Sequence, residues 1–223
     1  TPTGIVRDPR FYLNAKAIDA RTRTEVTAID RKDHTVSYRN LATGETGSMG
    51  YDKLIIATGA TPKMPPIPGT DLKGITTLQS MQDADFLRKV RDEGVIKKAA
   101  IIGGGLIGIE TCEALQLAGI DITVIELLPQ LLTFLDWDLA KLVENHVRSK
   151  NANVITGNGI AEFLGENGTL TGVKLQNGTE LPCELAVVAI GVTPNVRLAR
   201  EAGLTIGVTG GIEVNEYMQT SDP

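Results

Sequence analysis

The sequence predicts an α/β fold, with a parallel sheet and its helices after residue 97 and a β-rich region before it. After residue 97, short apolar strands alternate with helical segments, and this βαβαβ order implies a parallel sheet with right-handed crossovers. Before residue 97, short runs of alternating polar and apolar residues are separated by turn-forming residues, which is typical of antiparallel strands.

Local patterns place the elements of the β-rich region. The expected elements are strands at 25–30 and 35–39, a loop or hairpin tip at 41–50, a strand at 53–57 and a helix at 80–91. The segment 61–69 carries four prolines, which exclude a helix or a central strand, so we expect a linker or domain boundary there. Ser80 with Asp83 three residues later is typical of a capped helix start.

The second region is more regular. The expected elements are strands at 99–102, 121–126, 153–156 and 185–190, a helix at 106–118 ended by Gly119, and a second helix capped by Asp136. On that second helix, apolar residues recur at i, i+3 and i+4, so we expect a buried face formed by Leu139, Leu142, Val143 and Val147. Between the third and fourth strands, Asn167-Gly168 and Asn177-Gly178 favour type I′ turns that join three short strands.

Composition limits the class of protein. The 223 residues are 42% hydrophobic and 22% charged, which indicates a soluble globular chain of one large or two modest domains. A net charge of −5 without a basic block makes nucleic acid and anionic membranes unexpected partners. The apolar runs are too short to span a bilayer, and the first ten residues lack the apolar segment of a signal peptide.

The chain has two cysteines, Cys112 and Cys183, too few for a disulfide scaffold, so a reducing cytoplasm is the expected location. His34 and His146 are not spaced to complete a zinc site with them, and we expect no metal. At both cysteines, a small buried residue is favoured over a reactive thiol.

The strongest motif is a glycine loop. Gly103, Gly105 and Gly108 match G-x-G-x-x-G between a predicted strand and a predicted helix. In such loops the first glycine makes the tight turn, the second allows the backbone to approach a pyrophosphate, and the third lets helix and strand pack closely. The free N–H groups of the following helix, from Leu106 and Ile107 onward, would face the pyrophosphate.

An acidic residue follows at the position where such sites hold a ribose. Glu126 lies eighteen residues after Gly108, at the end of the next predicted strand. A carboxylate there accepts hydrogen bonds from ribose hydroxyls and repels a 2′-phosphate, and residues 127–130 contain no arginine or lysine. The pattern therefore favours NAD over NADP. The alternative is that Glu126 merely ends a strand in solvent.

Three further motifs extend the pattern along the chain. Ala57-Thr58-Gly59, within residues 51–62, resembles the A-T-G motif of flavoproteins with two dinucleotide-binding domains. Gly191 to Asn195 resembles their G-x-x-P-N motif, and residues 211–223 resemble the segment that leads into their second FAD motif. With the glycine loop, these motifs resemble the FAD-dependent pyridine nucleotide-disulfide oxidoreductase family, in particular its coenzyme A-disulfide reductase and NADH oxidase branch.

The resemblance implies a fold and an activity. It implies a Rossmann-like three-layer (ββα) NAD(H)-binding domain at 97–212 and an incomplete, β-rich part of an FAD-binding domain at 1–96 and 213–223. In the family, NADH passes a hydride to FAD, which then reduces a disulfide, a persulfide or sulfur acceptor, or oxygen.

The resemblance also assigns site residues. The residues implied for NAD(H) are Gly103, Gly105, Leu106, Ile107, Gly108, Glu110, Glu126 and Gly191, and those implied for FAD are Val26, Ala57, Thr58 and Gly59. Glu110 matches a glutamate that orients the nicotinamide, and its alternative is a solvated first-turn glutamate that interacts with the helix dipole. The alternative for 57–59 is an ordinary strand end.

The chain also departs from the family pattern. The family begins with an FAD glycine loop followed by a redox-active cysteine, and we expect both ahead of residue 1, just as the second FAD motif and the dimerisation domain would follow residue 223. We therefore expect a fragment that is inactive alone, from a parent that dimerises through a further C-terminal domain. Leu106 stands where the glutathione reductase branch often carries an aromatic residue. The alternative functions are a non-catalytic NAD-sensing or interaction module and an ordinary NAD-dependent dehydrogenase, which would lack a catalytic His, Tyr or Lys constellation.

Overall fold

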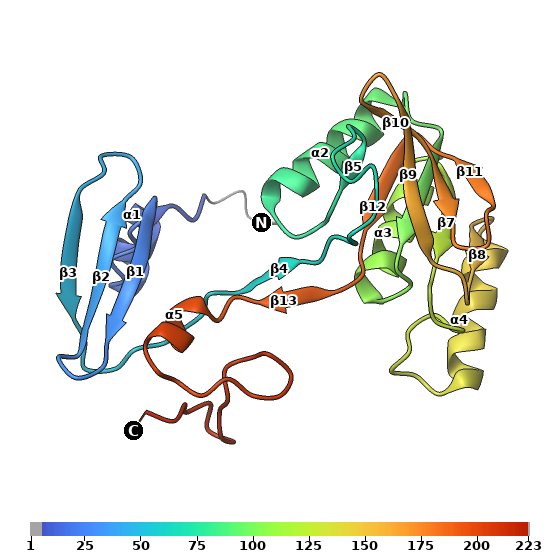
Figure 1. The fold of residues 1–223 in the computed structure, drawn as a ribbon. Coiled ribbons are helices and arrows are strands. Elements are labelled where there is room, and N and C mark those ends of the chain that lie inside the picture. Colours follow the sequence, from blue (N-terminus) through green and yellow to red (C-terminus); the bar gives the residue numbers. More distant parts are fainter. Residues whose placement is uncertain (1–5, 223) are drawn as a thin grey trace. The chain divides into compact units, whose positions relative to one another are not determined.

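The protein consists of two compact units in a computed structural model that describes residues 6–222 (Figure 1). One unit comprises residues 60–193, and the other comprises the chain up to residue 59 and from residue 194 onward. These units divide the chain at other positions than the predicted cofactor domains, 97–212 and 1–96 with 213–223. The assignment of those domains to NAD(H) and FAD stays a prediction, and their ends at 1–5 and 223 lie outside the described residues.

The unit 60–193 is built on a parallel sheet of five strands, in the order β5-β12-β6-β7-β8. The strands are β5 (Ile75–Thr76), β6 (Lys98–Ile102), β7 (Asp121–Ile125), β8 (Asn153–Ile155) and β12 (Leu185–Val188). The order of strands and helices confirms the predicted βαβαβ unit. Residues of β12 are buried throughout, because layers cover both faces of the sheet.

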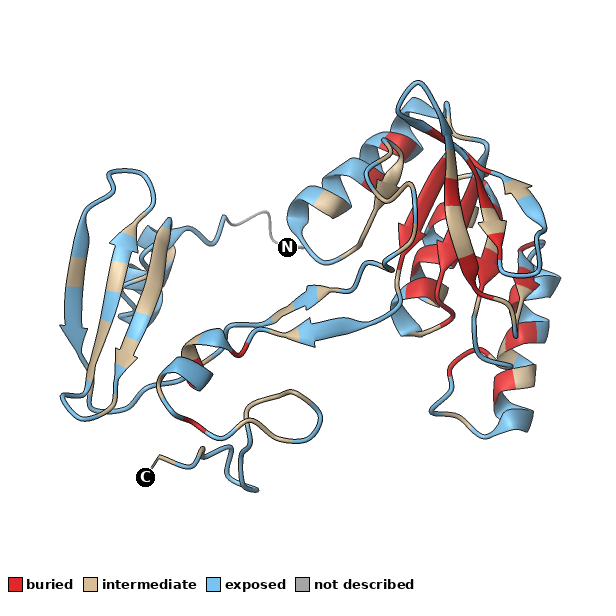
Figure 2. Cartoon of the chain, viewed as in Figure 1, coloured by how far each residue is buried: buried red, intermediate tan, exposed pale blue. Residues whose placement is uncertain are grey.

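Helices cover one face of this sheet and antiparallel strands cover the other. Ala99 and Ile101 of β6 belong to the apolar cluster that includes α2 (Met81–Glu93), α3 (Leu106–Gln116) and α4 (Trp137–Ser149). Ala100 and Ile102 belong to a second cluster, with β9 (Ile160–Glu166), β10 (Thr169–Leu175) and the segment before β12. Since successive strand residues point to opposite faces, the two clusters define three layers. The predicted ββα architecture is confirmed, and Figure 2 shows buried residues concentrated in these layers.

The antiparallel layer has the order β11-β10-β9, with β11 spanning Glu180–Pro182. Asn167 and Gly168 both have positive φ angles, 51° and 75°, as the predicted type I′ turn requires. The same prediction for Asn177-Gly178 is wrong, because only Gly178 has a positive φ angle. Asn177 instead accepts a hydrogen bond from the N–H of Thr179 at its own side-chain oxygen, which stabilises a different turn.

The helix ends agree with the sequence in part. Ser80 and Asp83 form the predicted capping box at the start of α2: each side chain accepts from the backbone N–H of the other. Helix α3 ends at Gln116 with Leu117 as its C-cap, two residues before the predicted end at Ala118 with Gly119 as the cap. Asp136 is the N-cap of α4 by position, without a side-chain capping bond.

The predicted buried face of α4 is wrong in two of its four residues. Leu139 and Leu142 are exposed, the latter by 65%, whereas Val147 is buried and Val143 packs against the core. The buried residues of the helix are Ala140, Glu144 and Val147. The buried face of the helix therefore includes a charged residue, Glu144, which a search for apolar periodicity does not select.

Glu144 is 6% exposed and is held by two cations of its own helix. Lys141 donates to one of its oxygens at 2.6 Å, and Arg148 donates to the other at 2.9 Å. Arg148 also donates to the carbonyl oxygen of Val154 on β8. Burial disfavours the charged form of Glu144, but the hydrogen bonds and charges of Lys141 and Arg148 outweigh this effect and lower its pKa. The cluster thus ties α4 to the edge of the sheet.

The proline-rich segment is part of this unit rather than a free linker. Its first residues form β4 (Ala60–Pro62), which pairs with β13 (Val192–Pro194) in a two-stranded sheet. Further on, the carbonyl oxygen of Pro68 accepts from the N–H of Phe163, and Lys73 exchanges backbone bonds with the Gly168–Leu170 segment. Prolines exclude a helix here, but the carbonyl oxygen of Pro68 still accepts a hydrogen bond from β9.

The other unit contains a three-stranded antiparallel sheet of order β1-β2-β3 and two short helices. Its elements are α1 (Pro9–Lys16), β1 (Thr24–Asp30), β2 (Thr35–Asn40), β3 (Thr46–Gly50) and α5 (Arg197–Glu201). Strands β1 and β2 confirm the predicted pair. Helix α1 was not predicted, although Asp8 caps it and Pro9 occupies its first turn, both usual start signals.

Two predictions in this unit are wrong. Residues 46–50 form β3 beside β2 and are not part of a loop. Residues 53–57 form no strand, and Ile55 is 90% exposed. A short apolar strand needs neighbours to pair its backbone, and among residues 6–222 no strand is paired with this segment.

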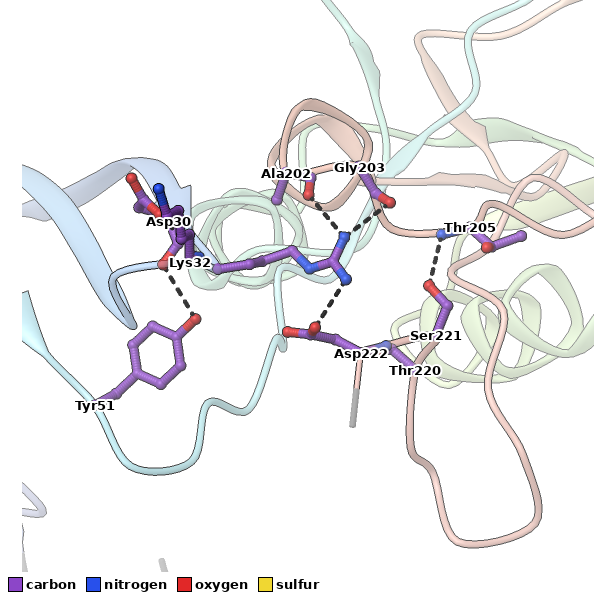
Figure 3. A network of polar contacts seen from close by, with 10 residues as sticks. Asp30, Lys32, Tyr51, Ala202, Gly203, Thr205, Thr220, Ser221 and Asp222 are labelled. Carbon is purple, nitrogen blue, oxygen red and sulfur yellow. Dashed lines mark hydrogen bonds and ion pairs between the residues drawn. The ribbon is translucent and has the colours of Figure 1, made fainter.

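The segment before the C-terminus is fastened by Arg31, in the turn after β1. Its guanidinium donates to the carbonyl oxygens of Ala202 and Gly203 at the end of α5 and to Asp222 at 2.8 Å. The hydrogen bond from Arg31 lowers the pKa of Asp222. Figure 3 shows Asp222 beside Ala202 and Gly203, and Ser221 beside Thr205. The motif at 220–223 is therefore ordered up to Asp222, and its last residue lies outside the described residues.

Every helix of the chain between residues 6 and 222 is too short or too polar to cross a bilayer.

Candidate functional site

A cleft of about 920 Å³ opens in the unit 60–193, at the carboxyl ends of β6, β7 and β12. In open parallel sheets, ligands bind at this end of the strands. The cleft is lined by the glycine loop and the first turn of α3, by the end of β7 and the loop after it, by the end of β12, and by part of the proline-rich segment. The residues that line the cleft include Gly103, Gly104, Gly105, Leu106, Ile107, Glu126, Leu127, Leu128, Leu132, Phe134, Ile190, Gly191 and Val192.

Two loop glycines lie where a side chain would collide with the protein itself. Gly103 has a φ angle of +110°, and a Cβ atom there would overlap the carbonyl oxygen of Ala189. A Cβ atom on Gly108 would overlap the carbonyl oxygen of Gly103. The chain therefore turns sharply out of β6, and α3 packs directly on the end of the strand.

Gly105 differs from its neighbours because the space in front of it is open. Apart from Gly105 and its two chain neighbours, no atom of residues 6–222 lies within 4 Å of the position that its Cβ atom would occupy. Gly105 is the N-cap of α3, and no side chain caps the helix. The first N–H groups of the helix have no partners within it, so they could donate hydrogen bonds to a diphosphate in this opening.

The carboxylate of Glu126 lines the cleft and lies against the glycine loop. One of its oxygens accepts from the N–H of Gly104 at 2.6 Å, and the other accepts from the N–H of Leu128 at 2.8 Å. The half-buried Glu126 is thus held in place by backbone atoms on both sides. The alternative of a carboxylate that merely ends a strand in solvent does not describe this geometry.

The loop after Glu126 forms an apolar wall that the sequence reasoning missed. Leu128, Leu132 and Phe134 line the cleft, and the N–H of Leu132 donates to the carbonyl oxygen of Gly104 at 2.9 Å. Residues 127–135 contain no arginine or lysine, so this wall offers no cation to a 2′-phosphate. The run of leucines was a visible signal, but it did not show which of them face the cleft.

The remaining residues implied for NAD(H) divide into two groups. Gly191, Leu106 and Ile107 line the cleft, and the carbonyl oxygen of Gly191 accepts from the N–H of Lys63. Glu110 is exposed on α3 and is not among the lining residues. Its role toward the nicotinamide therefore stays a prediction.

The residues implied for FAD lie in the other unit. Ala57, Thr58 and Gly59 are exposed, and Val26 is half-buried on β1. The side chain of Asn195 donates to the carbonyl oxygen of Thr58 at 3.0 Å, and the Thr58 hydroxyl donates back to the carbonyl oxygen of Asn195 at 2.5 Å. The A-T-G and G-x-x-P-N motifs are thus bonded to each other.

Neither cysteine is placed for nucleophilic chemistry. Cys112 is 2% exposed and Cys183 is 3% exposed, which confirms the prediction that both are buried. Burial, with a smaller effect from Glu113, raises the pKa of Cys112 to about 11. Burial and the charge of Glu184 raise the pKa of Cys183 to about 12. Both thiols therefore stay protonated at neutral pH.

The three-layer fold, the glycine loop and the carboxylate beside it define a Rossmann-like protein of the dinucleotide-binding class. The sequence profile of the pyridine nucleotide-disulphide oxidoreductase family matches residues 8–223, and the chain belongs to this family. Its enzymes use FAD and a pyridine nucleotide.

Characterised relatives agree with this assignment. The chain is 35% identical to an NADH oxidase of Methanocaldococcus jannaschii over 98% of its own length and 48% of the relative. It is 32% identical to an NAD(P)H coenzyme A polysulfide/persulfide reductase of Pyrococcus horikoshii, over 96% of the chain and 46% of the relative. The chain thus spans about half the length of these relatives.

A solved structure is similar over the whole chain. The NAD-dependent persulfide reductase from A. fulgidus superposes with a TM-score of 0.92 at 41% identity, covering 100% of this chain and 40% of that one. These similarities confirm the predicted family and branch, and they do not favour a non-catalytic sensing module.

Proposed function

We propose that the chain is the NAD(H)-binding portion of a flavoprotein oxidoreductase that passes a hydride from NADH to FAD and on to a disulfide, persulfide, sulfur or oxygen acceptor. The observation that carries the proposal is the open glycine loop with the carboxylate of Glu126 hydrogen-bonded beside it in one cleft. The names of the relatives support this range of acceptors, since they include an NADH oxidase and a persulfide reductase.

The residues of the cleft would divide the binding of NADH among them. The backbone at Gly105, Leu106 and Ile107 would hold the diphosphate, because the helix start supplies free N–H groups and a positive dipole. The carboxylate of Glu126 would accept hydrogen bonds from the adenosine ribose. Gly191 would line the pocket through its backbone, and Glu110 would orient the nicotinamide.

The second cofactor is assigned to the other unit. Val26 and residues 57–59 would contact FAD, and the bonds between Thr58 and Asn195 hold the exposed A-T-G segment in one conformation. When bound, the flavin accepts the hydride and transfers electrons to the acceptor. The cytoplasmic location and a homodimer formed through a further domain stay predictions.

Isothermal titration calorimetry of the chain with NADH and NADPH tests the proposal. We expect NADH to bind at least tenfold more tightly, because a 2′-phosphate would meet a carboxylate and no cation. Gly105→Val should abolish binding of both nucleotides, since its side chain fills the opening before the helix. Gly50→Ala is the matched control: its Cβ atom would meet only an ordinary contact with the carbonyl oxygen of His34 at 3.9 Å.

Two outcomes contradict the proposal. Equal binding of NADH and NADPH would refute the role of Glu126, and unchanged binding by Gly105→Val would refute the diphosphate site.

A further inference from the structure

We infer that Gly104, the middle glycine of the loop, is the positioning residue for the Glu126 carboxylate and thereby sets the preference for NADH over NADPH. This inference rests on the proposed function, because it concerns the same cleft. Gly104 is not one of the three motif glycines, and no site role was predicted for it.

The carboxylate is oriented before any ligand arrives. The N–H of Gly104 donates to Oε2 of Glu126 at 2.6 Å, and the N–H of Leu128 donates to Oε1 at 2.8 Å. The two donors come from different segments, the loop after β6 and the loop after β7. Rotation of the carboxylate would break both bonds at once, so its plane is fixed relative to the glycine loop.

The hydrogen-bonding capacity that remains matches a ribose. An ionised carboxylate has about four acceptor positions, two on each oxygen. Gly104 and Leu128 each occupy one of them, so each oxygen of Glu126 keeps about one position for a hydroxyl group. A ribose with free 2′- and 3′-hydroxyls can fill both. A 2′-phosphate replaces one of these hydroxyl donors and adds negative charge beside the carboxylate. The fixed orientation of Glu126 therefore favours NADH over NADPH.

The absence of a side chain at Gly104 keeps this arrangement intact. A Cβ atom there would overlap Cδ2 of Leu131 and would lie 3.3 Å from both Cβ and Oε2 of Glu126. Leu131 is fully buried and cannot swing aside without disturbing the core. The φ angle of Gly104 is not in the left-handed region, so alanine would be acceptable to the backbone itself. The consequence of a substitution would therefore arise from these contacts.

The collision would be transmitted to both donors. Leu131 belongs to the same loop as Leu128, and the next residue, Leu132, is bonded through its N–H to the carbonyl oxygen of Gly104. A displaced Leu131 would shift this loop away from the glycine loop. Glu126 would then lose its fixed orientation, although its own side chain is unchanged.

Two neighbouring alanine variants of the chain test the inference, with the dissociation constants of NADH and NADPH measured by calorimetry. Gly105→Ala places its methyl group in the open diphosphate site, so it should weaken both nucleotides by the same factor and leave their ratio unchanged. Gly104→Ala should weaken NADH by about tenfold or more, the effect of losing one hydrogen bond to a charged group, and NADPH much less. The ratio of the NADPH dissociation constant to the NADH dissociation constant should therefore fall toward one only in Gly104→Ala.

A rescue variant separates positioning from general damage. Leu131→Ala removes the methyl group that the new Cβ atom would meet, so Gly104→Ala combined with Leu131→Ala should regain most of the wild-type ratio. Leu131→Ala alone should keep the ratio despite a lower melting temperature. If Gly104→Ala alone does not fold, by circular dichroism, the double variant decides: a wild-type ratio supports the inference and a lost ratio overturns it.

The outcomes distinguish the inference from the function on which it rests. A wild-type chain without NADH preference would contradict the proposed function. A wild-type chain that prefers NADH, with a Gly104→Ala variant that keeps the same ratio, would leave the function standing and overturn the inference.

Discussion

Replacing Glu126 by glutamine should weaken NADH binding strongly, even though the two side chains have nearly the same shape. Both carboxylate oxygens accept from backbone N–H groups, of Gly104 and of Leu128. An amide offers one acceptor oxygen and one NH₂ donor, so in either orientation its NH₂ group must face one of these N–H groups. The variant therefore loses a backbone bond and places two donors against each other.

The magnitude follows from the bonds that are lost. A hydrogen bond to a charged group contributes about 1.5–3 kcal/mol, so losing one ribose bond alone should raise the dissociation constant of NADH about 10- to 150-fold. NADPH should lose less, because the variant also removes the charge that repels its 2′-phosphate. The loss of the backbone bond should in addition lower the melting temperature of the chain.

Calorimetric titration of Glu126→Gln with both nucleotides measures these effects, and a thermal melt measures the stability. Glu113→Gln is the matched control, since it removes the same charge from an exposed position on α3 outside the cleft. A Glu126→Gln variant that binds NADH within twofold of the wild type would show that the carboxylate does not hold the ribose.

Three further outcomes concern stability and the thiols. Glu144→Gln should lower the free energy of unfolding by about 1–3 kcal/mol at pH 7 in denaturant titrations. The folded-state pKa of Glu144 lies below its ordinary value of 4.5, so its contribution to the free energy of unfolding is complete above pH 4.5 and is lost as the pH falls through the folded value. The plots of stability against pH for the wild type and for Glu144→Gln should therefore converge in acid. Plots that stay parallel would contradict the assigned ion pairs. Ser80→Ala should cost about 1 kcal/mol by the same measurement, through loss of the cap that pairs with Asp83, and no change would show that the cap contributes nothing. Cys112 and Cys183 should resist a thiol reagent at pH 7.5 in the native chain and react after unfolding, because burial raises both pKa values; fast native labelling would show that the unit opens.

The sequence was sufficient where the signal was local or fully apolar. The continuous apolar runs at 99–102 and 185–190 predicted strands, which the structure forms as β6 and, as far as Val188, as β12. The capping box at Ser80 and the turn at Asn167-Gly168 were predictable for a similar reason, since each depends on a few neighbouring residues.

Where the outcome depended on tertiary contacts, the sequence was misleading. The apolar period of α4 included Leu139 and Leu142, yet the helix buries Glu144, because Arg148, which pairs with it, also donates to the carbonyl oxygen of Val154 on the neighbouring strand β8. Residues 53–57 have the composition of a strand, but a strand also requires a neighbour to pair with.

The motif residues of the candidate site could be predicted from the sequence, but the residues that position them could not. The spacing of the glycines and of Glu126 follows from a strand, a turn and a helix, all visible in the sequence. The contact between Gly104 and Leu131 joins two loops that lie far apart along the chain. No periodicity or local propensity reports such a contact, which is why Gly104 and the apolar wall were missed.

The pairing of β6 with β7 has a consequence for how mutations in this family should be read. Ile102 pairs with Ile125. Ile102 is the last residue before the turn at Gly103, and Ile125 is the last residue before Glu126, so the backbone pairing of the two strands fixes the position of the turn relative to that of the acid. Deleting a single residue from either strand would slide the strand end beyond the deletion by about 3.3 Å and turn the side chains there to the opposite layer. Such a variant would still match the dinucleotide-binding motif letter for letter, yet its acid would no longer meet the loop.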